Sequence, residues 1–330
     1  MRYAASMNCL YLGYETAQWY WEHAVSGAQT LRTQLRVGAL DGCVSTPTEV
    51  REIVRGTMFQ DMPLHVLTSG RFSRNDRGVL FHEHTGVFPK DAFVRLTPSI
   101  FVASPQLTFL QVARGAAFGQ AFLLGSVMCG SYALCEARES GTVERPRLVE
   151  ARQLLNFARA NGALPGSRGA QQVAKYLIDG SASPRETAAL ATLALPMRHG
   201  GKGLSGALLN YRIDIPKRYA WPGKRNYFKA DLCWPQEKVI VEYDSDAEHL
   251  RKQSIYRDAE KRNTLIDMGY TPICLTSMQL DSPSDLAAAA EVIRRALGRR
   301  RQPRPDGYDR RVIELRKGLG LPWFEGQKTY

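Results

Sequence analysis

The sequence predicts a two-domain protein of mixed class, in which an α+β N-terminal domain precedes an α/β domain. With 330 residues the chain is long enough for two ordinary domains, and its 44% hydrophobic content suffices for real cores. In the first half, short β-type runs alternate with helical stretches, whereas the second half follows the order α-β-β-β-α-β-α. We expect domains at 1–165 and 166–298, followed by a basic C-terminal tail at 299–330.

The N-terminal domain begins with about sixty residues that look helical and contain a break near DGCVSTPTE. Four β-type runs follow, LHVLTS, GVLFHEH, AFVRLT and IFVAS, separated by turn residues. Ser104 and Pro105 suit the N-cap and first position of a helix, so a long apolar helix is expected from there. Residues 115–135 carry no charge, but serines, a glutamine and glycines dilute them. A buried helix followed by a turn is therefore expected there rather than a membrane span.

In the second domain, Ser183, Pro184 and Glu186 fit a capping box, which predicts a helix running to Leu195. The run NYRIDI is typical of a strand, and two further strands flank the turn WPQEK. The expected elements after these are a charged helix over about 247–268 that ends at Gly269, a strand at TPICLT, and a helix over about 285–297.

Two acids, Asp231 and Glu242, lie inside the apolar strands on either side of that turn, where carboxylates are depleted and costly to bury. If the strands pair antiparallel and turn at residues 236–237, Asp231 lies directly opposite Glu242. The same register gives three apolar pairs, Leu232 with Val241, Cys233 with Ile240 and Trp234 with Val239, and it places Lys229 opposite Asp244 as a salt-bridge partner or a phosphate contact.

Opposed like charges destabilise a sheet, so a cation is expected between Asp231 and Glu242. Carboxylate ligands favour Mg²⁺ or Mn²⁺ over zinc, and such an ion can serve phosphodiester hydrolysis. The alternative is that both acids lie on a solvated sheet face and pair with arginines nearby.

The net charge of +12 is concentrated in residues 212–229 and 294–330, which flank the acids and predict a polyanionic partner such as DNA. The arginine-rich tail would add salt-sensitive affinity, unless it is only a flexible solubilising tail. The candidate DNA contacts are Lys217, Arg218, Lys224, Arg225, Arg251, Arg257 and Lys261.

The N-terminal sequence lacks the features of a secretory signal, so we expect a cytoplasmic protein with no membrane partner. The six cysteines are scattered without a CxxC pair, which predicts reduced thiols and no structural zinc. His82 and His84 share a strand face but lack an evident third ligand, so a core or surface role is expected.

The motif that runs from Asp231 through EYDS, His249 and RDAEKRN to GYTPICLT resembles the PD-(D/E)XK nuclease superfamily. Within it, residues 170–297 are similar to an uncharacterised bacterial domain related to the very-short-patch repair endonuclease. The resemblance implies a restriction-endonuclease-like fold, with a mixed central sheet flanked by helices, and Mg²⁺-dependent cleavage of DNA. It also implies that Asp231 and Glu242 bind the metal.

The same resemblance implies further ligands, the backbone carbonyl of Tyr243 and, unless it serves only as a capping residue, Glu186. The superfamily's usual lysine is replaced here by Asp244. Its role would pass to Lys229, to His249 as a proton shuttle or phosphate contact, to Arg251 or Lys252, or to a second metal bound partly by Asp244. If none of these serves, activity is lost, and the protein is a DNA-binding regulator or antitoxin that keeps the nuclease fold. A third reading is a protein-interaction scaffold.

In the first domain, PLHVLTSGRFSRNDRGVLFHEH and FVRLTPSIFVASPQLTFLQVAR are similar to the C-terminal part of the abortive-infection antitoxin (AbiEi-like) family. This implies an accessory or regulatory domain with a protein partner of the toxin–antitoxin or defence type. That family usually begins with a winged helix-turn-helix, which the sequence before this region does not supply. Three arginines here are either phosphate contacts or solvated loop residues, namely Arg71, Arg74 and Arg77.

Overall fold

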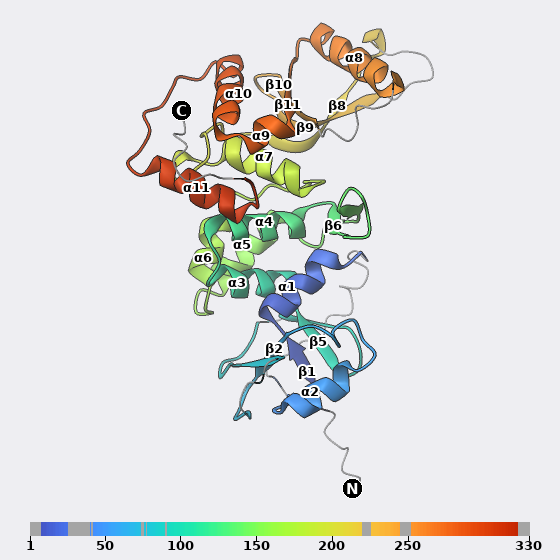
Figure 1. Cartoon of the computed structure of the whole chain (residues 1–330), viewed down its shortest axis with the longest axis vertical. Helices are drawn as coiled ribbons and strands as arrows, with labels where there is room; N and C mark the ends of the chain where they lie inside the picture. The colour runs from blue at the N-terminus through green and yellow to red at the C-terminus, as the bar shows by residue number, and fades with distance from the viewer. Residues whose placement is uncertain are drawn as a thin grey trace. The chain divides into compact units, whose positions relative to one another are not determined.

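The chain divides into two compact units, one of Met1–Ala116 with Val127–Leu177 and the other of Ala117–Ser126 with Ile178–Tyr330. Helices and sheets occur in both, so the mixed α and β class is confirmed (Figure 1). This grouping differs from the expected segments 1–165, 166–298 and 299–330. The computed structural model describes residues 8–25, 40, 42–73, 76, 78–89, 91–219, 226–244 and 252–322, with only the backbone described at 252–258.

The first unit is built on a five-stranded mixed sheet of order β3-β2-β1-β5-β4. Its strands are β1 (Leu10–Leu12), β2 (Leu64–Thr68), β3 (Val79–Glu83), β4 (Phe93–Arg95) and β5 (Ile100–Ala103). The pairs β2–β3 and β1–β5 are parallel, and the other two are antiparallel. The central strand β1 lies in the stretch expected to be helical. Its three residues are fully or almost fully buried and too few to show an alternating pattern.

The helices of this unit follow local signals in the sequence. Helix α1 (Tyr14–His23) is followed by α2 (Pro47–Val54), which begins at a capping box formed by Thr46 and Glu49. Helix α3 (Pro105–Ala113) begins at Ser104 as predicted. The uncharged stretch forms α4 (Phe118–Cys129), whose residues as far as Ser126 belong to the second unit. The remaining elements of the first unit are the hairpin β6 (Tyr132–Leu134) and β7 (Thr142–Glu144), α5 (Ala151–Ala160) and α6 (Ser167–Ala174). No helix in the described ranges is long and apolar enough to cross a membrane.

Histidines line one part of the first sheet. His65 Nδ1 lies 3.0 Å from His82 Nε2 and 2.8 Å from Glu15 Oε2, while the Tyr14 ring stacks on His82 at 4.0 Å. His84 stacks instead on a phenylalanine ring. His82 of β3 and His84, which directly follows this strand, thus pack against separate partners, in agreement with the core or surface role expected for them.

The second unit contains the predicted order α-β-β-β-α-β-α. It runs α7 (Pro184–Ala194), β8 (Leu208–Asp214), β9 (Tyr227–Trp234), β10 (Val239–Asp244), α8 (Lys252–Asp267), β11 (Thr271–Thr276), α9 (Ser277–Asp281), α10 (Pro283–Ala296) and α11 (Tyr308–Gly318). The sheet has the order β11-β10-β9-β8, in which β10–β11 is parallel and the other pairs are antiparallel. A mixed sheet is therefore present, as expected.

Both faces of the β9–β10 hairpin are covered near its turn. The Trp234 side chain is fully buried, and its Nε1 donates to the carbonyl oxygens of Leu204 and Ser205 at 3.1 and 3.0 Å. On the face that also carries the acids, Cys233 and Ile240 pack with Leu265 of α8 in one buried cluster. The apolar layers on the two sides hold this hairpin in place.

Part of the expected basic tail forms helix α11 in the second unit and has a buried face. Tyr308, Val312 and Leu315 of α11 are buried, because their spacing of i, i+4 and i+7 places them on one helix face. At α4, a Cβ added to Gly119 would lie 2.8 Å from the carbonyl oxygen of Leu315. Glycine at this position therefore permits a close approach of α4 and α11.

Arg316 of α11 is 1% exposed and connects its helix to two other segments of backbone. Its guanidinium donates to the carbonyl oxygens of Pro322 at 2.8 Å, Leu280 at 3.1 Å, and Asp281. Burial lowers the pKa of Arg316 to about 10, so the group is still charged at neutral pH. The hydrogen bonds replace the water that the guanidinium loses on burial.

We expect Arg316→Met to destabilise the protein by about 3 kcal/mol or more, because buried carbonyl oxygens lose their donor. Urea unfolding followed by circular dichroism measures this. Arg310→Met is the matched control, since Arg310 is exposed and pairs with Glu314 on the helix surface. It should change stability by less than about 0.5 kcal/mol. Equal effects of the two substitutions would contradict the role assigned to Arg316.

The histidine contacts predict a pH dependence of stability. Burial, together with the nearby His65, lowers the pKa of His82 from its ordinary value of 6.5. The folded state thus favours neutral His82. The contribution of His82 to the free energy of unfolding is therefore complete above pH 6.5 and is lost as the pH falls through the lowered pKa. The stability difference between wild type and His82→Gln, measured by urea unfolding, should shrink between pH 7 and pH 5. A difference that stays constant would contradict this.

Candidate active site

The predicted register of the hairpin is confirmed. The observed pairs are Val239 with Trp234, Ile240 with Cys233 and Val241 with Leu232. The ladder ends at this last pair, and the same register continued by one residue would place Glu242 opposite Asp231. On the next strand, Glu242 pairs with Cys274 of β11. On the other side, the residues before and after Asn210 in β8 pair with those after and before Asp231 in β9, so Asn210 lies next to Asp231. A row of four polar side chains thus crosses the sheet.

Asp231 acts on the backbone of the neighbouring strand. Its Oδ2 accepts a hydrogen bond of 2.7 Å from the backbone N–H of Tyr243. The Tyr243 hydroxyl in turn accepts from Arg185 Nε at 2.9 Å, and Arg185 Nη1 forms an ion pair of 2.7 Å with Asp281. The residue after Glu242 is therefore held at its backbone by Asp231 and at its side chain by α7.

Glu242 is paired with a cation from α8. Its Oε2 lies 2.9 Å from Lys261 Nζ, and Lys261 also donates to the backbone carbonyl of Lys229 at 2.9 Å. The Glu242 and Lys261 side chains are only 29% and 26% exposed, and Glu242 Oε1 is buried. Lys261 stands one turn before the buried Leu265, so the packing of α8 directs it toward the sheet. Lys261 was expected at the DNA surface and lies instead at the second acid.

Glu186 reaches the same region from the first turn of α7. Its Oε2 accepts from Asn210 Nδ2 at 2.7 Å and from the backbone N–H of Ala182 at 3.0 Å. Burial raises the pKa of Glu186, and the negative charge of Asp231 raises it further. Ser183 caps the helix as predicted, but the carboxylate binds the N–H of Ala182 rather than that of Ser183. The capping box is therefore shifted by one residue.

Asp244, which stands where a lysine is usual, lies beside a thiol. Cys274 Sγ donates to Asp244 Oδ2 at 3.7 Å, and burial followed by the charge of Asp244 raises the pKa of Cys274. Lys229 was expected opposite Asp244, but the observed β9–β10 pairs end at Leu232 with Val241. On its other edge Lys229 lies next to Arg212 of β8, and its side chain is exposed. The contribution of Lys229 to the site in this structure is its carbonyl oxygen.

The remaining candidates lie apart from the acids or outside the described residues. Lys217 and Arg218 are exposed on a 3₁₀ turn, Lys217–Tyr219, where the Arg218 guanidinium stacks on Tyr219 at 4.7 Å. Arg71 is exposed in its loop. The candidates whose side chains lie outside the described residues are Arg74, Arg77, Lys224, Arg225, His249, Arg251, Lys252 and Arg257.

Sequence reasoning did not single out two of the residues that build this site. Arg185 lies directly before Glu186 at the start of α7, where its position gives no hint of a contact with β10. Asn210 carries a weak signal, because asparagine interrupts a strand pattern and tolerates the positive φ of 47° that it adopts here. Both residues act on neighbours distant in sequence.

The carboxylates suit a hard cation in type, although the described residues contain no group of three or more His, Cys, Asp and Glu side chains arranged to hold a metal ion. Mg²⁺ commonly binds through one or two carboxylates and retains several waters. No protein-family model, curated protein or solved structure matches this chain. Assignment of the site therefore rests on the residues themselves.

We expect Asp231→Asn to lower the pKa of Glu186, because it removes the neighbouring negative charge while an amide oxygen can still accept from Tyr243. Titration of the carboxyl carbons by NMR measures the shift. Asp214→Asn is the control, since Asp214 is an exposed acid of β8 that pairs with Arg212. An unchanged Glu186 pKa in Asp231→Asn would contradict the electrostatic coupling.

Proposed function

We propose that the second unit is a metal-dependent DNA endonuclease of the PD-(D/E)XK type, with Asp231 and Glu242 as its acids. The observation that supports this most is that each acid lies one residue beyond the last observed pair of two adjacent strands, with Lys261 at Glu242. Two acids and a lysine at one point of a mixed sheet match the chemical needs of phosphodiester hydrolysis.

The metal we propose is Mg²⁺ or Mn²⁺, held by Asp231, Glu242 and the backbone carbonyl of Tyr243. When bound, such an ion polarises a phosphate oxygen and lowers the pKa of a bound water. Both oxygens of Glu186 already accept hydrogen bonds from its neighbours, which argues against Glu186 as a ligand. We therefore assign Glu186 to orienting Asn210 and the start of α7.

Lys261 is our candidate for the role of the lysine that Asp244 replaces. Its ammonium group contacts Glu242 and is held by a helix whose next turn is buried at Leu265. From there it would stabilise negative charge that develops on a phosphate or on an attacking hydroxide. His249, Arg251 and Lys252 are not needed for this assignment.

DNA is the proposed substrate, because the chain carries a net charge of +12, and Lys217 and Arg218 present exposed positive charge near the start of β9. We further propose a bacterial cytoplasmic setting in repair, defence or mobile-element maintenance. The first unit would be an AbiEi-like accessory domain that contacts a protein partner of the toxin–antitoxin or defence type.

The second candidate function is a DNA-binding regulator or antitoxin that keeps the fold without the chemistry. One observation favours it: Asp231 and Glu242 each have a contact that gives them a structural role, with the Tyr243 N–H and with Lys261. Acids retained only for structure would explain both contacts.

We expect the wild-type protein to nick or linearise plasmid DNA with Mg²⁺ or Mn²⁺, and EDTA to abolish cleavage. Asp231→Asn, Glu242→Gln and Lys261→Met should each reduce the cleavage rate by about 100-fold or more. Asp214→Asn should cut like wild type. Single-turnover cleavage rates, followed by gel electrophoresis of the plasmid, test these expectations.

Binding experiments separate the two candidates. Mn²⁺ binding, followed by water proton relaxation, should be lost in Asp231→Asn and Glu242→Gln but retained in Lys261→Met. If the wild type shifts DNA in a gel but never cuts it with either metal, the regulator is correct and the endonuclease proposal fails.

A further inference from the structure

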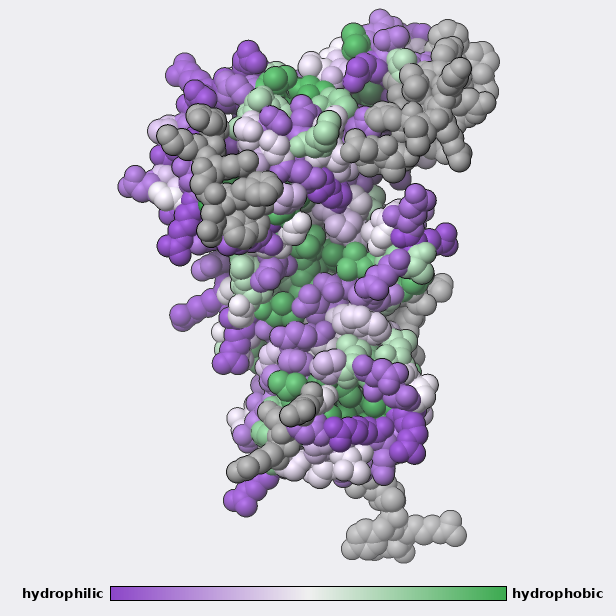
Figure 2. Space-filling view, viewed as in Figure 1, coloured by the Kyte–Doolittle hydropathy of each residue, from purple (hydrophilic) through white to green (hydrophobic). Residues whose placement is uncertain are grey.

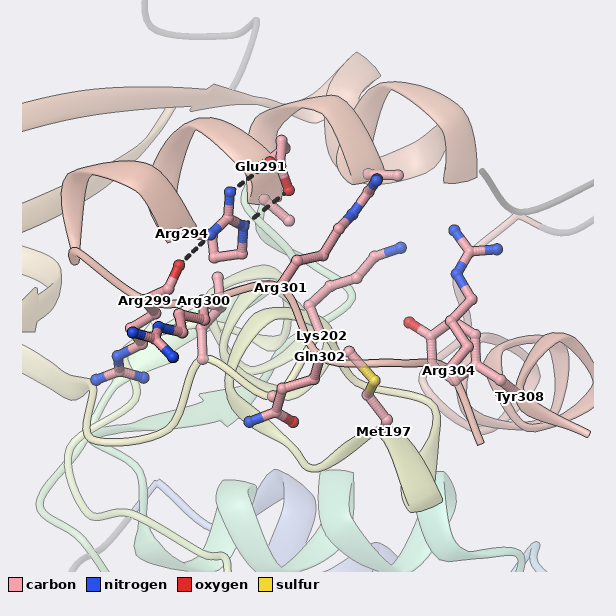
Figure 3. A pocket seen from close by; sticks show the side chains of 14 residues that line it. Met197, Lys202, Glu291, Arg294, Arg299, Arg300, Arg301, Gln302, Arg304 and Tyr308 are labelled. Carbon is pink, nitrogen blue, oxygen red and sulfur yellow. Dashed lines mark hydrogen bonds and ion pairs between the residues drawn. The ribbon is translucent and has the colours of Figure 1, made fainter. Parts of the chain in front are cut away.

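A second polar site lies in the second unit, and none of the acids described above lines it. It is a pocket of about 500 Å³ formed by the residues before β8, by α10 and the segment that follows it, and by Tyr308 at the start of α11 (Figure 3). Ligand pockets usually have volumes of about 300–1,000 Å³, so this one is large enough for a small molecule.

The pocket is strongly positive. Its lining contains six cations and one acid, namely Lys202, Arg294, Arg299, Arg300, Arg301, Arg304 and Glu291. The acid is already engaged, because Arg294 Nε and Nη2 bind the two Glu291 oxygens at 2.9 and 2.6 Å. Arg299 is also partly neutralised, by Glu237 at 3.1 Å, and Arg304 has Asp309 at 3.9 Å. The segment that carries Arg299–Arg304 appears mostly hydrophilic in Figure 2.

Three of these cations are directed to one side of the pocket. Figure 3 shows the side chains of Lys202, Arg301 and Arg304 extending the same way, while those of Arg299 and Arg300 point to the opposite side. Lys202 and Arg304 also lie over the Tyr308 ring, with Nζ 5.8 Å and Cζ 5.5 Å from its centroid. The aromatic ring thus places two cations close together.

Gathering cations in a recess costs free energy, because like charges repel and burial removes their water. The effect is visible at Lys202, where burial and the charges of Arg304 and Arg316 lower the pKa to about 8 even though the negative charge of Asp309 acts in the opposite direction. The Tyr308 hydroxyl offers no compensating charge, since it donates to the carbonyl oxygen of Gly201 at 3.2 Å and burial raises its pKa to about 12. An anion in the pocket would offset this repulsion.

We propose that this pocket binds a small ligand with two or more phosphate groups, such as a nucleoside diphosphate or triphosphate. Arginine guanidinium groups match phosphate oxygens in paired hydrogen bonds, and several of them favour a multiply charged anion. The apolar part of the lining would contact the organic portion of the ligand and comprises Met197, Leu204, Ala287 and Ala290.

A small ligand fits the site better than a nucleic acid does. The cations come from three separate stretches of chain and surround a recess, whereas a duplex backbone is best met by a continuous basic surface. The proposal does not depend on the proposed nuclease activity, because it uses none of the residues of the sheet site.

Calorimetric titration of the full chain with pyrophosphate, ADP and ATP tests the proposal. We expect all three to bind, and Arg301→Gln and Lys202→Gln each to weaken binding about tenfold or more. Arg310→Gln is the matched control, because it removes the same charge from an exposed position of α11. It should leave the dissociation constant unchanged within about twofold. If ADP binds more tightly than pyrophosphate, the ligand class is a nucleotide. If the two bind equally, the phosphate groups alone are recognised.

The pH dependence provides a second readout. Because an anion favours protonated Lys202, affinity should fall between pH 7 and pH 9 in the wild type, and Lys202→Gln should flatten this part of the profile. Arg301 is exposed, so Arg301→Gln is expected to fold even if Lys202→Gln does not.

Two outcomes would overturn the proposal. One is that none of the three anions binds at about 1 mM, which corresponds to about −4 kcal/mol. The other is that Arg310→Gln weakens binding as much as Arg301→Gln does, which would show a diffuse attraction to the basic surface. A third outcome would also overturn it. If pyrophosphate fails to bind while duplex DNA binds in a way that requires Lys202 and Arg301, the pocket is a nucleic-acid site.

Discussion

The pairing register of β9 and β10 is the constraint on which the candidate active site depends. A shift of one residue would turn Asp231 to the opposite face of the sheet and expose the side chains that are now buried. The register is held by apolar packing on both faces, with Trp234 on one and Cys233 with Ile240 on the other. The acids themselves contribute little to this choice, because like charges at opposed positions disfavour it.

Each acid of the site is accommodated by a partner of a different kind. Asp231 accepts from a backbone N–H, Glu242 meets an ammonium group, and Glu186 accepts from an amide side chain. Such partners replace the water that a carboxylate loses on partial burial. The basic pocket presents the opposite case, where six cations gather around one acid, so the second unit has two regions of opposite charge.

The sequence was informative where a local pattern determines the structure. Two apolar runs on either side of the turn WPQEK, with the turn placed at residues 236–237, predicted the register, and Ser104 with Pro105 predicted the start of α3. It was uninformative where the partner is distant. The three residues of β1 are buried by neighbours from elsewhere in the chain, and the direction of Lys261 depends on how α8 packs. The apolar face of α11 was not predicted, because most residues of this stretch are charged and its few apolar residues share a face only when the stretch is helical.

The close approach of Gly119 to Gly318 has a consequence for how the chain folds. The two residues are separated by most of the sequence, and contacts of such high sequence separation close large loops and form slowly. During synthesis, the first part of α4 leaves the ribosome long before α11 does. The second unit can complete its core only after its last helix has been made, and until then the apolar surface of α4 requires protection from aggregation.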